Sequence, residues 1–382
     1  MSAVPPQRWE VRVQRPIAYD VIKAPALFDP ANDLLMSFGN PHGRRFVVVD
    51  GTVDRLHGER IRGYFRERGI EARIQVFPGG EEHKNSEIYQ DIARALDAFP
   101  IHRRDEPVIA IGGGVLTDVV AFVAASYRRG VPHIKVPTTL MGYVDAALGI
   151  KAGINFNGNK NRLGAFEPPL AVLLDRSFLP TLPRRHLVNG VCEIIKLAII
   201  RDAGLFQRLE RDAARAVATC FSEPAGEAIL DGAIGGMLEE LAPNLHEEEL
   251  ARRVDFGHTF SYGLETRHEH RLLHGEAVLL DILVSTCIAQ ARGLLSAFEA
   301  DRIFALVEAL DAGLDYGVLD TDLMWASLLD RIKHRNGLQR VPMPTGIGHC
   351  LFLNDISRAE LDAAVLALHS RTKASHEPAI EC

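Results

Sequence analysis

The sequence has few cysteines, no paired-cysteine motif and no long apolar run. Its five cysteines are scattered along 382 residues without a C-x-x-C pair, so neither a zinc knuckle nor a disulfide framework is indicated. No stretch of about 18 uninterrupted apolar residues is present to span a bilayer, and residues 1–15 lack the apolar core of a signal peptide. The sequence therefore predicts a cytoplasmic protein with no membrane partner.

The chain also lacks a long basic run, although it contains 43 basic residues. Because 50 acidic residues outweigh them, the net charge is −7, which argues against nucleic acid as a partner. An anionic substrate must then be bound by a local pocket. The length, with 47% hydrophobic residues, predicts two globular domains of ordinary composition.

Residues 1–180 alternate between short apolar runs and helical patterns. Strands are expected over 11–26, 45–50, 71–77 and 108–111, with helices over 55–68, 85–98 and 115–125. This order predicts a Rossmann-like α/β domain with a mostly parallel sheet. The turn Gly112-Gly113-Gly114 has the strand, glycine, helix order of a phosphate cradle, but it is not the G-x-G-x-x-G fingerprint, and a plain tight turn fits nearly as well.

Helical periodicity takes over in residues 181–382, which are expected to form an all-α C-terminal domain. The predicted helices cover 186–199, 203–219, 225–241, 257–267, 275–292 and 299–311. The domain boundary is placed near residue 180, after two prolines. Clefts between domains are common ligand sites, so the chemistry is expected there.

Glu193, His258 and His274 form a set suited to a divalent metal. A lone histidine is more often a structural residue than a ligand. Glu193 strengthens the metal hypothesis, because an unpaired carboxylate in the apolar run 190–198 would be costly to bury.

The segment 134–169 is rich in polar groups although it lies between apolar strands. Lys151, Lys160, Asn161 and Arg162 could bind a phosphorylated, polyhydroxylated ligand. A solvated loop explains the composition equally well.

Seven motifs occur in the order typical of one enzyme superfamily. They are Pro78-Gly79-Gly80-Glu81-x-x-Lys84, Gly112-Gly113-Gly114-Val115-x-x-Asp118, Pro137-Thr138-Thr139-Leu140, Lys160-Asn161, Glu193-x-x-Lys196, Gly257-His258-Thr259 and Leu273-His274-Gly275-Glu276-Ala277. Together they resemble the dehydroquinate synthase superfamily of sugar-phosphate cyclases. The resemblance implies a two-domain enzyme with NAD, a zinc or cobalt ion and a homodimeric assembly.

The resemblance also assigns residues. The metal ligands fall on Glu193, His258 and His274, whereas His268 and His270 match no ligand. The nucleotide positions are Asp50, Glu81, Lys84, Gly113, Gly114, Val115, Asp118, Thr138 and Thr139, with Lys151 and Lys160 beside them. Substrate contacts fall on Arg129, Asp145, Lys151, Lys160, Asn161 and Lys196.

Two of these assignments have structural alternatives. Lys196 lies one helical turn from Glu193 and could serve only as its ion-pair partner. Asp145 would equally suit a helix cap.

The chain departs from dehydroquinate synthase itself at several positions. Asp255 stands in place of an asparagine, Tyr262 of a second histidine and Ala251 of an arginine, and Lys333-His334 replaces a lysine pair. Fewer cations for a substrate carboxylate imply a neutral sugar chain, so Asp255 and His334 are expected to orient the substrate.

Three patterns resemble the branch that uses sedoheptulose 7-phosphate: Met237-Leu238-Glu239-Glu240-Leu241-x-x-Asn244-Leu245, Val254-Asp255-Phe256-Gly257-His258-Thr259-Phe260-Ser261 and Lys160-Asn161-Arg162-Leu163-Gly164-Ala165. Within it, Asp255 together with His334 resembles the 2-epi-5-epi-valiolone synthases that serve C7-cyclitol biosynthesis. Tyr262 stands where this branch is expected to have proline, which leaves a different product stereochemistry open. The implied reaction is transient oxidation by NAD, phosphate elimination, reduction and aldol cyclisation, catalysed by a carbon–oxygen lyase acting on phosphates. A 2-epi-valiolone synthase, a desmethyl-4-deoxygadusol synthase or a divergent 3-dehydroquinate synthase are alternatives. More distant ones are an iron-dependent polyol dehydrogenase and a regulatory protein without catalysis.

Overall fold

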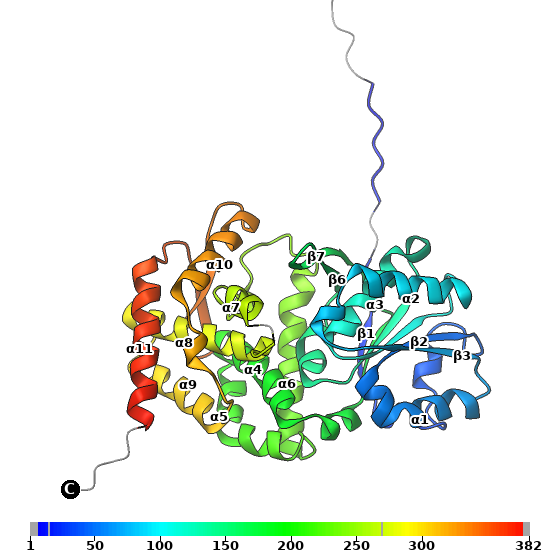
Figure 1. Ribbon diagram of the computed structural model, residues 1–382, viewed down its shortest axis with the longest axis horizontal. Helices are drawn as coiled ribbons and strands as arrows, with labels where there is room; N and C mark the ends of the chain where they lie inside the picture. Colours follow the sequence, from blue (N-terminus) through cyan, green and yellow to red (C-terminus); the bar gives the residue numbers. More distant parts are fainter. Residues whose placement is uncertain (1–6, 14–15, 269, 377–382) are drawn as a thin grey trace, which may run out of the picture.

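The computed structural model describes residues 7–13, 16–268 and 270–376, which form two lobes side by side (Figure 1). The N-terminal lobe runs to the end of strand β8 and contains a six-stranded sheet. The C-terminal lobe begins with helix α4 and is mainly helical. The predicted fold class is confirmed.

The sheet of the N-terminal lobe is wholly parallel. Its order is β1-β8-β5-β4-β2-β3. The strands are β1 (Asp20–Lys23), β2 (Arg45–Asp50), β3 (Ala72–Phe77), β4 (Val108–Gly112), β5 (His133–Pro137) and β8 (Ala171–Leu174). Parallel strands end at the same edge, so residues that follow β2, β4 and β5 gather there.

Helices cover both faces of this sheet. They are α1 (Gly51–Glu67), α2 (Ser86–Ala98) and α3 (Gly114–Ser126). Val47 and Val49 of β2 pack in the core under α1, whereas Phe46 and Val48 pack under α2 and α3. Because successive side chains of a strand point to opposite faces, a strand covered on both sides must be apolar throughout, as β2 is.

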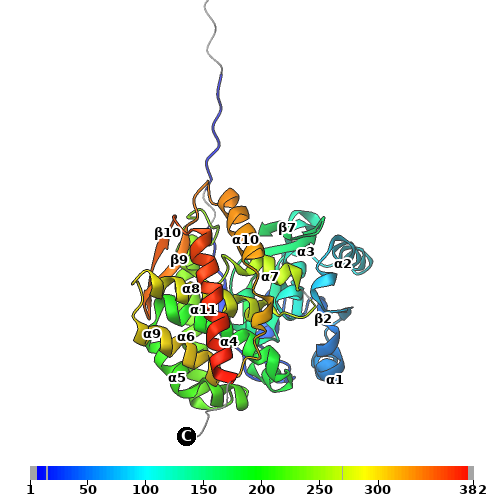
Figure 2. The ribbon, with the colours of Figure 1, turned by 60° about the vertical axis from the view of Figure 1, so that its left-hand side comes forward.

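The C-terminal lobe is a helical assembly around α8 (His274–Ala291), which is buried along residues 275–289 (Figure 2). The other helices are α4 (Arg184–Arg201), α5 (Ala203–Ala218), α6 (Pro224–Leu241), α7 (Ser261–Arg267), α9 (Ala297–Ala309), α10 (Thr321–His334) and α11 (Arg358–His376). An antiparallel pair, β9 (Val341–Gly346) and β10 (His349–Leu353), interrupts the expected all-α character. No helix among the described residues is long and apolar enough to cross a membrane; the cytoplasmic location stays a prediction.

Two elements differ from the predicted pattern. Among the described residues of the expected strand 11–26, only β1 forms a strand; residues 7–13 run extended away from the body (Figure 1), with Trp9 78% exposed. The helix expected from residue 257 begins at Ser261, because Gly257 has a φ of +75° and turns the chain.

The segment 134–169 contains a hairpin where a loop was an alternative. Strands β6 (Lys151–Phe156) and β7 (Asn159–Phe166) pair antiparallel beside α3. A short π-helix, η4 (Gly142–Ala146), precedes them and packs in the same apolar core as α4 and α8. The two lobes therefore share part of one core.

Candidate active site

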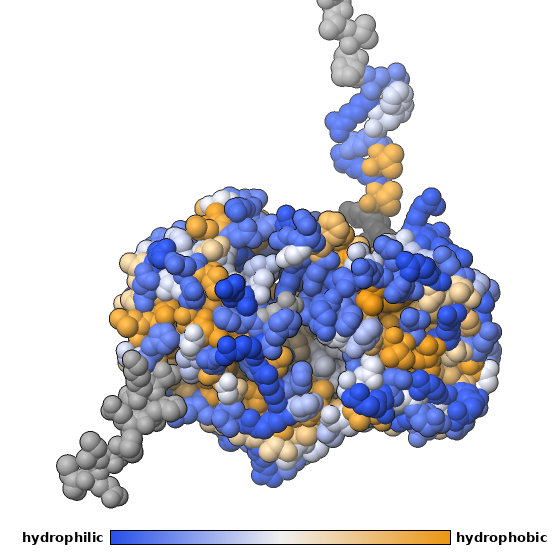
Figure 3. All heavy atoms as spheres, in the orientation of Figure 1, coloured by the Kyte–Doolittle hydropathy of each residue, from blue (hydrophilic) through white to orange (hydrophobic). Residues whose placement is uncertain are grey.

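A cleft of about 830 Å³ lies where the hairpin β6–β7 and η4 face the C-terminal lobe. In Figure 3 the surface is hollowed between the two lobes. Eight predicted site residues line this cleft: Asp118, Asp145, Lys151, Asn161, Lys196, Asp255, His258 and His274. Asp118 and His274, which are 156 positions apart in the sequence, thus line the same cleft.

Three different elements position the predicted metal ligands. Glu193 lies in α4, His258 in the loop before α7, and His274 is the first residue of α8. The loop approaches α8 so closely that a Cβ on Gly257 would sit 2.7 Å from Val278 Cγ1. Only glycine fits this close turn with a positive φ, and the turn directs His258 toward the other two ligands.

The ligand atoms converge. His274 Nε2 lies 3.4 Å from Glu193 Oε1 and 3.3 Å from His258 Nε2, and His258 Nε2 lies 3.6 Å from the same Glu193 oxygen. One atom from each residue falls within 4.8 Å of the others. Among the residues that the structure describes, no other three His, Cys, Asp or Glu side chains meet in this way.

The chemistry of this donor set fits a divalent cation. His258 Nδ1 is 3.0 Å from the Phe256 carbonyl, to which it donates, so its Nε2 carries a lone pair toward His274. Burial alone would lower the pKa of His274, but Glu265 and Glu193 raise it to about 10. Both Glu193 oxygens are buried: Oε1 lies near the two histidines, and Oε2 forms an ion pair with Lys196. Two nitrogens and a carboxylate around one position are the ligands that zinc prefers.

Lys196 and Asp145 lie beside this set. Lys196 is buried and forms an ion pair with Glu193 one turn away on α4. Burial alone would raise the pKa of Glu193, but the Lys196 ammonium holds it below the ordinary value. Burial raises the pKa of Asp145, which comes from η4 rather than from a helix cap.

The predicted nucleotide residues line the carboxyl edge of the sheet. Asp50 ends β2 and caps α1, its Oδ1 accepting from Thr52 N at 2.8 Å. Lys84 Nζ donates to Asp118 Oδ2 at 2.7 Å. The remaining positions lie on the same edge: Glu81 before α2, Gly113, Gly114 and Val115 at the start of α3, and Thr138 and Thr139 after β5.

The glycine turn before α3 is needed for close packing. A Cβ on Gly113 would sit 3.1 Å from Thr139 Cγ2, and one on Gly114 would sit 3.0 Å from Ala146 Cβ. Gly113 makes no side-chain cap, so the first amides of α3 are available to an anion.

The hairpin carries three predicted substrate residues, of which Lys151 and Asn161 line the cleft. Lys151 pairs with Glu247, and Lys160 Nζ lies 2.7 Å from Glu265 Oε1. The Asn161 amide donates to Asn155 Oδ1 at 2.8 Å. Both lysines therefore reach from the N-terminal lobe to carboxylates of the C-terminal lobe.

Arg129 does not join this site. It is exposed after the C-terminal end of α3, whereas the cleft lies at the N-terminal end of that helix. A helix of 13 residues spans about 20 Å. Arg129 therefore lies away from the cleft of its own chain, and its contact with substrate stays a prediction.

His334 is also not among the residues that line the cleft, and its expected contact with substrate stays a prediction. Its side chain is 62% exposed at the end of α10, 3.8 Å from Asp330. The next residue, Arg335, turns inward instead, and its Nη2 binds Asp255 Oδ2 at 2.8 Å. Asp255 is also bound by Arg252 at 2.5 Å, so it holds two arginines at the cleft.

Sequence reasoning missed two buried carboxylates that support the ligands. Glu265 of α7 lies 3.0 Å from His274 Nδ1. Asp281 of α8 accepts from the amides of Phe260 and Ser261, which fixes the loop that carries His258. The position of Glu265, seven residues after His258 on one predicted helix, was the signal available for it.

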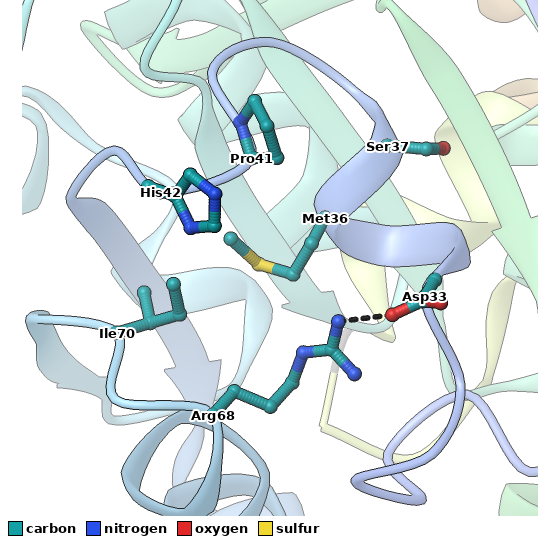
Figure 4. Close-up of a pocket in the computed structure, with 7 residues that line it drawn as sticks. All are labelled: Asp33, Met36, Ser37, Pro41, His42, Arg68 and Ile70. Atoms are coloured by element: carbon teal, nitrogen blue, oxygen red, sulfur yellow. Dashed lines mark hydrogen bonds and ion pairs between the residues drawn. The ribbon is translucent and has the colours of Figure 1, made fainter.

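A second hollow of about 350 Å³ lies on the N-terminal lobe, away from these residues (Figure 4). Asp33, Met36, His42, Arg68 and Ile70 are among its lining residues. Arg68 forms an ion pair with Asp33, so its charge is already compensated. No predicted site residue lies there.

Comparison with known proteins identifies the family. The family model 3-dehydroquinate synthase N-terminal matches residues 74–189, and 3-dehydroquinate synthase C-terminal matches 190–334. A 2-epi-5-epi-valiolone synthase of Streptomyces albus is 48% identical over 94% of this chain and 90% of its own. A demethyl-4-deoxygadusol synthase of Trichormus variabilis is 36% identical, over 94% of this chain and 89% of its own.

Among solved structures, ValA, a 2-epi-5-epi-valiolone synthase from Streptomyces hygroscopicus with NAD+ and Zn2+ bound, superposes with a TM-score of 0.91. It is 42% identical, and the match covers 95% of this chain and all of that one. The predicted resemblance is therefore confirmed. This chain belongs to the 3-dehydroquinate synthase family.

Proposed function

We propose that this protein is a sugar-phosphate cyclase that converts sedoheptulose 7-phosphate into 2-epi-5-epi-valiolone and inorganic phosphate. The observation that carries the proposal is the His258, His274 and Glu193 cluster beside a lysine-lined cleft. The identity of 48% to a 2-epi-5-epi-valiolone synthase, against 36% to a demethyl-4-deoxygadusol synthase, favours this branch.

The cofactors of this proposal are NAD and a divalent metal, zinc or cobalt. Glu193, His258 and His274 would hold the metal, and the carboxyl edge of the sheet, which includes Asp50, would hold NAD. When bound, the two supply a reversible hydride acceptor and a Lewis acid for the substrate oxygens. No net oxidation results, since the hydride is returned.

The residues of the chain then position the sugar and its phosphate. Lys151, Lys160 and Asn161 of the hairpin would bind the phosphate and stabilise the charge that develops as it leaves. Lys196 lies between Glu193 and the cleft, where its ammonium can hold a substrate hydroxyl. Phosphate leaves by elimination, which makes the enzyme a carbon–oxygen lyase in this proposal.

The test is to incubate the protein with NAD, zinc or cobalt and sedoheptulose 7-phosphate, following phosphate release and identifying the cyclitol by NMR. Release with 2-epi-5-epi-valiolone is the expected result. Release with another cyclitol would assign a different branch, 2-epi-valiolone or desmethyl-4-deoxygadusol synthase, and would direct attention to Tyr262 in α7.

Two further outcomes would reject the proposed reaction. Consumption of 3-deoxy-arabino-heptulosonate 7-phosphate instead would indicate a divergent 3-dehydroquinate synthase. Net NADH production from an unphosphorylated polyol would indicate a dehydrogenase.

The assembly we propose is the homodimer that the family resemblance implies. Sedimentation velocity on the intact chain measures this directly. A single species at the monomer mass, about 42 kDa, at micromolar concentration would reject the dimer.

A further inference from the structure

Glu265 is a largely buried carboxylate with no assigned role, and it contacts one residue from each lobe. Its side chain is 16% exposed. One oxygen, Oε2, lies 3.0 Å from His274 Nδ1, and the other, Oε1, accepts from Lys160 Nζ at 2.7 Å. A single side chain therefore touches a proposed metal ligand and a proposed phosphate-binding lysine.

The contact with His274 fixes how that ring is presented. Because Nδ1–H donates to Glu265, Nε2 is the atom directed at Glu193 and His258, 3.4 Å and 3.3 Å away. Carboxylates in this position make the ring a better ligand, and their loss typically weakens metal binding about 10- to 100-fold.

The contact with Lys160 joins the two lobes. Lys160 lies on β7 of the N-terminal lobe, and Glu265 lies on α7 of the C-terminal lobe. Both side chains are at least four-fifths buried, so solvent screens this ion pair less than a surface pair. The pair therefore fixes the hairpin relative to the metal centre.

We infer that Glu265 is a positioning residue that couples the metal centre to Lys160. The inference about metal affinity needs no turnover, whereas the inference about Lys160 rests on the proposed function. Glu265 orients His274 with one oxygen and holds Lys160 over the cleft with the other. Removing its charge is then expected to weaken metal binding and substrate binding together.

The first experiment measures zinc affinity by competition with a chromophoric chelator. Glu265→Gln keeps the size of the side chain and removes the charge, and we expect zinc to bind about 10- to 100-fold more weakly. Glu248→Gln is the matched control, because Glu248 is an exposed carboxylate of the same cleft. Its zinc affinity should stay within about twofold of the wild type.

An unchanged zinc affinity in Glu265→Gln would overturn the inference. Glu265→Asp, which keeps the charge on a shorter side chain, should lose less affinity than Glu265→Gln and serves as the second variant if the first does not fold. Equal losses in both would also contradict an orienting charge. A wild type that binds neither zinc nor cobalt would reject the proposed function instead, which keeps the two failures distinct.

The second experiment tests the coupling with zinc held at saturation. Lys160→Met and Glu265→Gln should each raise the KM for sedoheptulose 7-phosphate, and the double variant should raise it no further than Lys160→Met alone. Non-additivity is the mark of two residues that act as one unit. If the two effects multiply, Glu265 does not act through Lys160.

Discussion

At the scale of single residues, the partners of buried charges determined which site residues could be predicted from the sequence. Glu193 was predictable because a carboxylate in an apolar helix needs a partner, and it lies 1% exposed beside two histidines. The position of His334 could not be predicted from the sequence, because the end of α10 determines which neighbour turns inward. That residue is Arg335, which is 4% exposed and follows the last residue of the helix.

A residue-scale prediction concerns the ion pairs of Asp255. Asp255→Asn leaves Arg252 and Arg335 without their buried counter-charge, and we expect the free energy of unfolding to fall by about 3 kcal/mol. His334→Lys changes an exposed side chain and should alter it by less than about 0.5 kcal/mol. Urea unfolding of both variants checks this; equal losses would contradict the placement of His334 outside the cleft.

A second prediction concerns His133, which is fully buried and whose two ring nitrogens have no hydrogen-bond partner among the residues that the structure describes. Burial lowers its pKa to about 3 from 6.5 in the unfolded chain. Below pH 6.5 the unfolded chain therefore binds a proton that the folded chain does not, and stability falls as the pH falls.

The variant that tests this is His133→Leu. Between about pH 7.5 and pH 5, it should lose about 2 kcal/mol less stability than the wild type, since each pH unit below 6.5 costs about 1.4 kcal/mol. Denaturant unfolding at the two pH values gives the comparison. An identical loss in both proteins would show that His133 is not buried in its neutral form.

At the scale of elements, the apolar pattern predicted four of the six parallel strands and most helices, because each buries apolar side chains; β5 and β8 were not predicted. The hairpin β6–β7 was not separable from a loop, since its strands carry polar residues such as Lys151 and Lys160 and one of them, β7, is mostly exposed. The alternation of strands and helices predicted that the proposed nucleotide residues follow strands of a parallel sheet. The inward turn of Arg335 could not be predicted, because it depends on tertiary packing.

The element-scale prediction concerns the contact between α4 and the start of α8. A Cβ on Gly275 would sit 2.2 Å from the Asn189 carbonyl oxygen, so Gly275→Ala must displace one helix and with it His274. Metal sites tolerate displacements of only about 0.2 Å, so we expect zinc affinity to fall at least about tenfold.

Gly235→Ala in α6 is the control for this substitution. Nothing lies within 4 Å of its Cβ position, so it should stabilise the helix by about 0.5–1 kcal/mol and leave zinc binding unchanged. If Gly275→Ala binds zinc as the control does, the approach of the two helices is looser than described.

At the scale of the whole molecule, the shared core links the lobes. Leu140, Tyr143, Val144, Leu148 and Leu174 belong to the N-terminal half of the sequence but pack in the core of the C-terminal lobe. The predicted boundary near residue 180 separates sequence patterns, and it stays a proposal as a boundary of independent folding units.

We therefore predict that a fragment of residues 1–180 does not fold alone. Exposing about five large apolar side chains costs roughly 7–15 kcal/mol at 1.5–3 kcal/mol each, which equals the whole stability of a typical domain. Circular dichroism through thermal unfolding of the fragment measures this. A cooperative transition like that of the intact chain would contradict the shared core.

The extended segment at residues 7–13 has a practical consequence for such measurements. The chain has two tryptophans: Trp9 is 78% exposed on that segment, and Trp325 packs partly buried against the core of the C-terminal lobe. Since Trp9 is in water before and after unfolding, a change in intrinsic fluorescence reports on Trp325. The emission spectrum is therefore a local probe of the helical lobe. It does not report on the parallel sheet.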